Sequence, residues 1–166
     1  MIQSIIFSIA KEKYYFIHLK NLLFSGSSTT ESTTVPSSTG NVTIDCESPY
    51  DQWINLPDTV IMSPNHPQNY ENRKDCQVTI RFAEGQRVAI QFEAFDIESH
   101  SSCSWDYLKV RDGDNANSNL IGSKLCGSAN PGVIESTGNS MTLQFHTDGS
   151  VTKTGFKIRT SVGMNT

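Results

Sequence analysis

Residues 76 to 92, CQVTIRFAEGQRVAIQF, alternate apolar and polar side chains on both sides of a short turn that contains a glycine. The apolar positions share one phase on each side of the turn: Val78, Ile80 and Phe82, then Val88, Ile90 and Phe92. A period of two is typical of a strand that buries one face. The segment therefore predicts two antiparallel strands, residues 76–82 and 88–92, joined by a hairpin turn at 83–86.

Shorter apolar patterns of the same kind occur further along the chain. They predict three more strands, at residues 107–111, 141–146 and 156–162. The aromatic residues expected in the core are Trp53, Phe82, Phe92 and Phe145. The folded region contains no convincing helical stripe, and several short strands separated by turns indicate two packed antiparallel sheets. The predicted fold class is all-β.

The apolar phase slips between Phe92 and Ile97, which predicts a bulge or a strand corner near Ala94. Just past this strand stands Glu98, and Asp106 enters the next strand in the inward phase. A carboxylate in that position needs a hydrogen-bond donor or a cation, because burying it alone is costly. We therefore expect Asp106 to have such a partner, whereas Glu98 is expected to face away from the side that Ile97 buries.

The charge balance and the motifs exclude several classes of function. The chain of 166 residues has 17 acidic and 13 basic side chains and a net charge of -4. A nucleic-acid-binding protein usually shows a clustered basic excess, so we expect no nucleic-acid partner. The sequence contains no HExxH, GxSxG, GxGxxG or P-loop motif, so we do not expect an enzyme.

The four cysteines, Cys46, Cys76, Cys103 and Cys126, include no CxxC pair, which argues against zinc-thiolate and thioredoxin-like sites. Their even number favours two disulfides and therefore a secreted or extracellular protein. Four reduced core cysteines in a cytosolic protein are the alternative. Four cysteines allow three pairings. We favour the sequential one, Cys46–Cys76 and Cys103–Cys126, because each loop then closes locally.

The composition changes along the chain. Residues 1–24 mix short apolar runs with charges and fit a secretory signal poorly, so we interpret them as an atypical or misassigned leader without a membrane span. Residues 25–45 are mostly Ser and Thr and predict a disordered linker. Asn41 begins an N-glycosylation sequon. The folded domain is expected at 46–162, followed by a tail at 163–166.

Several short motifs follow one another in a specific order. They are Cys46, SPNHPQNY at 63–70, Cys76, FDIE at 95–98, CSWDY at 103–107, Cys126-Gly127, FHTD at 145–148 and Gly155-Phe156. This ordered set resembles a CUB domain over residues 46–162. The resemblance implies a β-sandwich of jelly-roll type and the same sequential disulfides.

The resemblance also implies the calcium-binding subtype of CUB domain. Its ligands would be the carboxylates of Glu98, Asp106 and Asp148 with a backbone carbonyl near Ser150, and the hydroxyl of Tyr70 would steady the glutamate. Calcium takes oxygen ligands, and three adjacent carboxylates repel one another without a cation. The alternative is that all three acids are solvated loop charges.

The function implied by the resemblance is an extracellular, calcium-dependent protein-binding module. It would recognise a basic side chain of a protein partner, above all a lysine, beside the bound calcium. Two alternatives remain open. The chain is a non-catalytic, substrate-directing fragment of a larger extracellular enzyme, such as an astacin-type or tolloid-like metalloprotease, or it is a structural or adhesive CUB protein that needs no calcium.

Overall fold

The structure is a computed structural model that describes residues 40–47 and 52–164. The expectations for the leader at residues 1–24 and for linker residues 25–39 lie outside the described residues. In the described part of the chain, no helix has the length and apolar character that crossing a membrane requires.

The described residues form ten strands. They are β1 Asn41–Thr43, β2 Trp53–Ile54, β3 Val60–Met62, β4 Asp75–Arg81, β5 Arg87–Asp96, β6 Tyr107–Asp112, β7 Asn119–Leu120, β8 Val133–Glu135, β9 Ser140–His146 and β10 Gly155–Gly163. The five strands predicted from the sequence are all present. Strand β10 ends one residue later than expected, at the first residue of the predicted tail.

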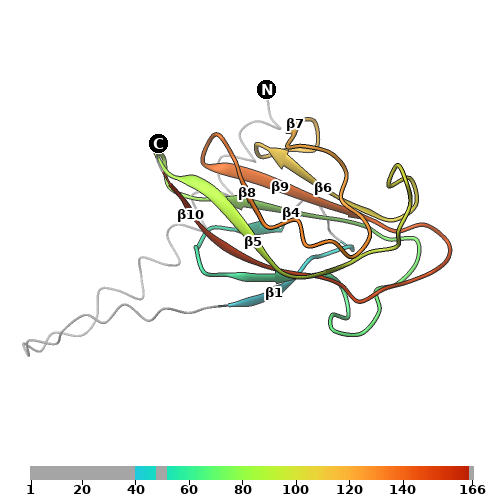
Figure 1. Ribbon diagram of the computed structural model, residues 1–166. Helices are drawn as coiled ribbons and strands as arrows, with labels where there is room; N and C mark the ends of the chain where they lie inside the picture. Colours follow the sequence, from blue (N-terminus) through green and yellow to red (C-terminus); the bar gives the residue numbers. More distant parts are fainter. Residues whose placement is uncertain (1–39, 48–51, 165–166) are drawn as a thin grey trace, which may run out of the picture. The chain divides into compact units, whose positions relative to one another are not determined.

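The strands form two five-stranded sheets that pack face to face (Figure 1). The first sheet has the order β1-β3-β10-β5-β8, and the second has the order β2-β4-β9-β6-β7. Most neighbours are antiparallel, and one edge pair in each sheet, β1 with β3 and β2 with β4, is parallel. Disulfides join Cys46 to Cys76 and Cys103 to Cys126. The predicted sandwich and the sequential pairing are confirmed.

Strand β5 contains the predicted irregularity. Lys157 pairs with Ala94, but the next residue of β10, Ile158, pairs with Phe92. Glu93 is therefore the extra residue of a β-bulge, next to the position where the apolar phase slips. The turn before β5 is also as predicted, because the Gln86 N–H donates to the Ala83 carbonyl.

The inward faces of the two sheets make one apolar core. Val78, Ile80 and Leu143 of the second sheet and Ile90 and Ile158 of the first are fully buried. Near one end of this core the Phe145 ring meets the rings of Tyr70 and Phe156 edge-on, at centroid distances of 5.1 and 5.3 Å. These aromatic contacts anchor Tyr70 in the core.

The predicted linker ends earlier than expected. Residues 41–43 form β1, paired in parallel with β3, and the side chain of Ile44 is 2% exposed within the core. The linker prediction is therefore wrong for residues 41–45. Its basis was local composition, which cannot detect pairing with a strand further along the chain. Asn41 is exposed on β1, and its glycosylation stays a prediction.

Trp53 corrects a second expectation. Its side chain is 49% exposed, not in the core, and the Arg81 guanidinium lies over its ring at 5.1 Å. Strand β2 is only two residues long and lies at a sheet edge, and its other residue, Ile54, is the one that is buried.

The role of residues 41–45 in the fold is testable. We expect Ile44→Ala to lower the free energy of unfolding by about 2–4 kcal/mol, because it leaves a cavity in the core. The control is Val133→Ala, at a side chain that is 58% exposed, where the loss should stay below about 0.5 kcal/mol. Urea unfolding curves measure both. Equal stability of the two variants would contradict the placement of Ile44.

Candidate metal centre

Strand ends bring three acidic residues to one end of the sandwich. Glu98 follows the end of β5, Asp106 precedes β6, and Asp148 follows β9. The antiparallel register places the ends that carry Asp106 and Asp148 side by side, because His146 of β9 pairs with Tyr107 of β6, and Glu98 comes from the other sheet. The connecting loops lie together on the right of Figure 1.

The three carboxylates form a compact cluster. One oxygen from each of Glu98, Asp106 and Asp148 lies within 4.8 Å of the others. Glu98 is 7% exposed, Asp106 is fully buried, and Asp148 is half-buried. The sequence predicted the inward position of Asp106, but Glu98, which was expected to face away from the side that Ile97 buries, is buried as well. At such distances, burial strengthens the repulsion among the negative charges.

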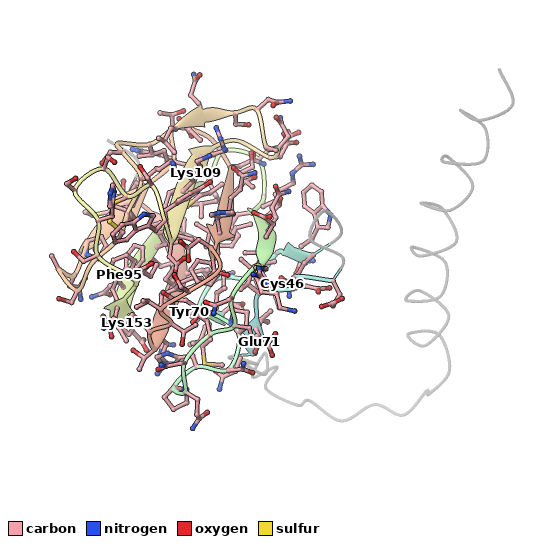
Figure 2. The ribbon with its side chains drawn as sticks, turned by 90° about the vertical axis from the view of Figure 1, so that its right-hand side faces the viewer. Cys46, Tyr70, Glu71, Phe95, Lys109 and Lys153 are labelled. Carbon is pink, nitrogen blue, oxygen red and sulfur yellow. A yellow bond between two sulfur atoms is a disulfide. The ribbon has the colours of Figure 1, made fainter. Side chains whose placement is uncertain are left out.

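Asp106 is held by two hydrogen bonds from different loops. The Tyr70 hydroxyl donates to Oδ2 at 2.6 Å, and the Asp148 N–H donates to Oδ1 at 2.7 Å. Burial of the ring and the bond to Asp106 raise the pKa of Tyr70, so the phenol stays protonated and remains a donor. Figure 2 looks at this end of the domain, with Tyr70 near the middle.

Tyr70 contacts Glu98 through the main chain. The hydroxyl accepts a hydrogen bond from the Glu98 N–H at 3.1 Å, while its own proton goes to Asp106. The resemblance implied that this hydroxyl steadies the glutamate. The structure places it on the Glu98 backbone instead of the carboxylate, so Tyr70 fixes the path of the chain at Glu98.

One oxygen of the Glu98 carboxylate has no hydrogen-bonding partner in the part of the chain that the structure describes. Its Oε2 is buried and, among the described residues, is the one such side-chain atom with no hydrogen bond. Burial, then the charges of Asp106 and Asp148, raise the pKa of Glu98, and His100 and Lys153 partly oppose this. The ionised form of Glu98 is therefore costly unless a cation approaches it.

Hydrogen bonds hold the loop at 147–154 against the loop that carries Tyr70. The Tyr70 N–H donates to the Lys153 carbonyl at 3.0 Å, and the Arg73 N–H donates to the Asp148 carbonyl at 2.7 Å. Ser150 is exposed, and its N–H donates to Asp148 Oδ1 at 2.8 Å. Its carbonyl as a metal ligand stays a prediction.

The disulfide Cys103–Cys126 ties the loop between Glu98 and Asp106 to the segment at Cys126. On this loop the exposed ring of Trp105 packs against the imidazole of His100, with ring centroids 4.3 Å apart. Both side chains lie on the segment that joins two of the acids. No sequence pattern indicates this contact, since it depends on how the loop folds back.

Comparisons with known proteins place this arrangement in context. A family model described as CUB domain matches residues 46–160. Mouse tolloid-like protein 1 is 47% identical over 96 residues, which are 58% of this chain and 9% of that protein. Pig cubilin is 41% identical over 97 residues, 58% of this chain and 3% of that protein. The chain thus spans only a small part of these relatives.

Solved structures show the same fold. The MASP-1 CUB2 domain bound to Ca2+ is 30% identical, with a TM-score of 0.59, over 67% of this chain and 97% of that one. The CUB1-EGF-CUB2 region of human MASP-1/3 is 32% identical, with a TM-score of 0.61, over 68% of this chain and 42% of that one.

Tyr70 provides a direct test of the site's internal support. Tyr70→Phe leaves the Glu98 N–H and Asp106 Oδ2 without the hydroxyl, so we expect a loss of about 1–3 kcal/mol in unfolding free energy. Tyr107→Phe is the matched control, since the Tyr107 hydroxyl makes no hydrogen bond with the described residues. Thermal unfolding of both variants measures the difference. If Tyr70→Phe is as stable as Tyr107→Phe, the hydroxyl does not hold this end together.

Proposed function

The chain belongs to the CUB domain family, and we propose that it is an extracellular module that binds a protein partner through a calcium ion held by Glu98, Asp106 and Asp148. CUB domains are non-catalytic interaction modules typical of extracellular proteins. The observation that carries the proposal is the buried Glu98 Oε2, which belongs to a cluster of three carboxylates and receives no hydrogen bond from residues 40–47 and 52–164. A bound cation would give this oxygen the favourable electrostatic partner that no hydrogen bond provides.

The donor set suits calcium. Three carboxylates, with water and a backbone carbonyl near Ser150, offer only oxygen ligands, which hard cations prefer. The nearby Cys103 and Cys126 are joined in a disulfide and offer no thiolate for zinc. Bound calcium would offset the mutual repulsion of the acids and order the loops that carry them. The calcium-bound MASP-1 domain, similar in fold, supports this choice.

The charge left at the site favours a basic partner. Three carboxylates carry more negative charge than one divalent ion removes, so the rim stays acidic. A compact lysine ammonium fits such a rim. The positive charge of Lys153 lowers the pKa of the Glu98 carboxylate, although burial and the charges of Asp106 and Asp148 raise this pKa more. On the loop between Glu98 and Asp106, the exposed ring of Trp105 offers apolar surface to the aliphatic stem of an incoming lysine.

A second candidate is that the domain directs substrate choice within a larger extracellular enzyme of the tolloid type. Its support is the similarity to tolloid-like protein 1, of which the matched region is 9%. Sequencing of the full transcript tests this candidate. An HExxH motif in the same reading frame would favour it, and a complete reading frame without a protease domain would exclude it.

Calcium should stabilise the domain. With a Kd of about 10⁻⁴–10⁻³ M, typical of extracellular modules, 10 mM calcium adds about 1.5–3 kcal/mol to the free energy of unfolding. Glu98→Gln should abolish the gain. Glu84→Gln, in the turn between β4 and β5 at the opposite end of the sandwich, should retain it. Thermal melts with calcium and with chelator measure the effect. Identical midpoints in the two conditions would favour the calcium-independent structural alternative.

Recognition of lysine should depend on calcium. On immobilised polylysine, the protein should be retained with calcium and released by chelator, and acetylated polylysine should not retain it. Glu98→Gln should elute early in both conditions, whereas Glu84→Gln should behave like the parent protein. Retention that resists chelator and persists in Glu98→Gln would show that net acidity, not the proposed site, binds the lysines.

A further inference from the structure

The outer face of the second sheet carries a hollow of about 240 Å³. Two cross-strand rows form its floor and walls. In one row Asp75 of β4 and Tyr107 of β6 flank His146 of β9, and in the other Gln77 and Lys109 flank Gln144. Because these residues share the outward phase of their strands, their side chains gather on one patch of the face.

Side chains of both rows form hydrogen bonds with one another and with the adjacent Arg111. Gln144 donates to the Gln77 side-chain oxygen at 3.1 Å, and Arg111 donates to the Gln144 side-chain oxygen at 2.5 Å. His146 Nδ1 lies 2.6 Å from a carboxylate oxygen of Asp75. The side-chain oxygens of Gln77 and Gln144 therefore already accept hydrogen bonds, and the floor of the hollow is a fixed polar surface.

Two lysines bring positive charge to the hollow: Lys109 lines it, and Lys124, which is not a lining residue, lies over the ring of the lining residue Tyr107. The ammonium groups of Lys109 and Lys124 lie 5.0 and 3.8 Å from the centroid of the Tyr107 ring. Within residues 40–47 and 52–164, no ion pair includes either lysine, whereas Lys74 and Lys157 each meet a glutamate. Partial burial, then the neighbouring charges of Arg111 and Lys124, lower the pKa of Lys109, and the charge of Asp75 partly opposes this. An anion would relieve this repulsion.

We propose that this hollow is a second docking site, where a carboxylate side chain from an acidic segment of a protein partner binds Lys109 and the neighbouring Lys124. It needs no calcium and does not rest on the function proposed above. Figure 2 shows Lys109 well above Tyr70, on the side of the domain away from Lys153. The two sites would therefore take opposite charges on different surfaces.

Three features favour an acidic peptide over other anions or a sugar. The volume admits a side chain or a similarly small group. The Tyr107 ring already contacts His146, Lys109 and Lys124, which leaves little of it for stacking on a sugar. The Asp75 carboxylate, whose side chain is 83% exposed at the rim, repels any anion, and it repels one carboxylate that enters beside Lys109 less than the closely spaced sulfates of a glycan.

The test uses the full chain and a capped, fluorescein-labelled hexaglutamate peptide, with fluorescence anisotropy in chelator as the readout. We expect saturable binding, and a loss of roughly tenfold or more in affinity when Lys109→Gln and Lys124→Gln are combined, because two charge-assisted hydrogen bonds are removed.

Three control variants accompany this test. Lys74→Gln combined with Lys157→Gln removes two positive charges elsewhere and should change the affinity for hexaglutamate little. Lys109→Arg with Lys124→Arg should keep most of the affinity. Glu98→Gln should leave binding unchanged, which separates this proposal from the calcium site.

Three outcomes would overturn the proposal. The first is the absence of saturable binding by hexaglutamate. The second is an equal loss of affinity in the two double-glutamine variants, which would indicate a general charge effect. The third is tight binding of a heparin hexasaccharide that depends on Lys109 and Lys124 while hexaglutamate binds weakly, which would assign the hollow to sulfated glycans.

Discussion

The buried carboxylate of Asp106 is the group on which the organisation of one end of the domain depends. It is fully buried, and its two oxygens accept hydrogen bonds from Tyr70 and from the Asp148 main chain. A buried charge without such donors would be strongly destabilising. The donors come from different loops, so satisfying Asp106 fixes where those loops run and brings the oxygens of Glu98 and Asp148 near its own. The acidic cluster thus follows from the hydrogen bonds that the Asp106 carboxylate requires.

Much of this could be predicted from the sequence, because it depends on local patterns. The period of two at residues 76–92 predicts β4, β5 and their turn, and the phase slip predicts the bulge at Glu93. Strand β1 was missed because its parallel pairing with β3 leaves no local signal. The bond from Tyr70 to Asp106 was also missed, since the choice of acceptor depends on ångström-scale placement of two loops. The hollow depends on register across three strands, which no single segment contains.

The two proposed sites have opposite charge on a domain of modest size. The end of the sandwich gathers Glu98, Asp106 and Asp148, and the outer face of the second sheet gathers Lys109 and Lys124. Neighbouring residues serve both regions, because Asp106 precedes Tyr107 and His146 lies two residues before Asp148. The same strand ends therefore position a cluster that calls for a cation and a hollow that calls for an anion.

The central claim is that the buried acidic cluster holds one calcium ion, and its position in a crystal tests this most directly. Crystals grown in calcium and measured at a long X-ray wavelength reveal the ion through its anomalous scattering. The account predicts one strong peak at about 2.3–2.6 Å from oxygens of Glu98, Asp106 and Asp148. A map with no peak there, or with calcium only elsewhere on the surface, would contradict it.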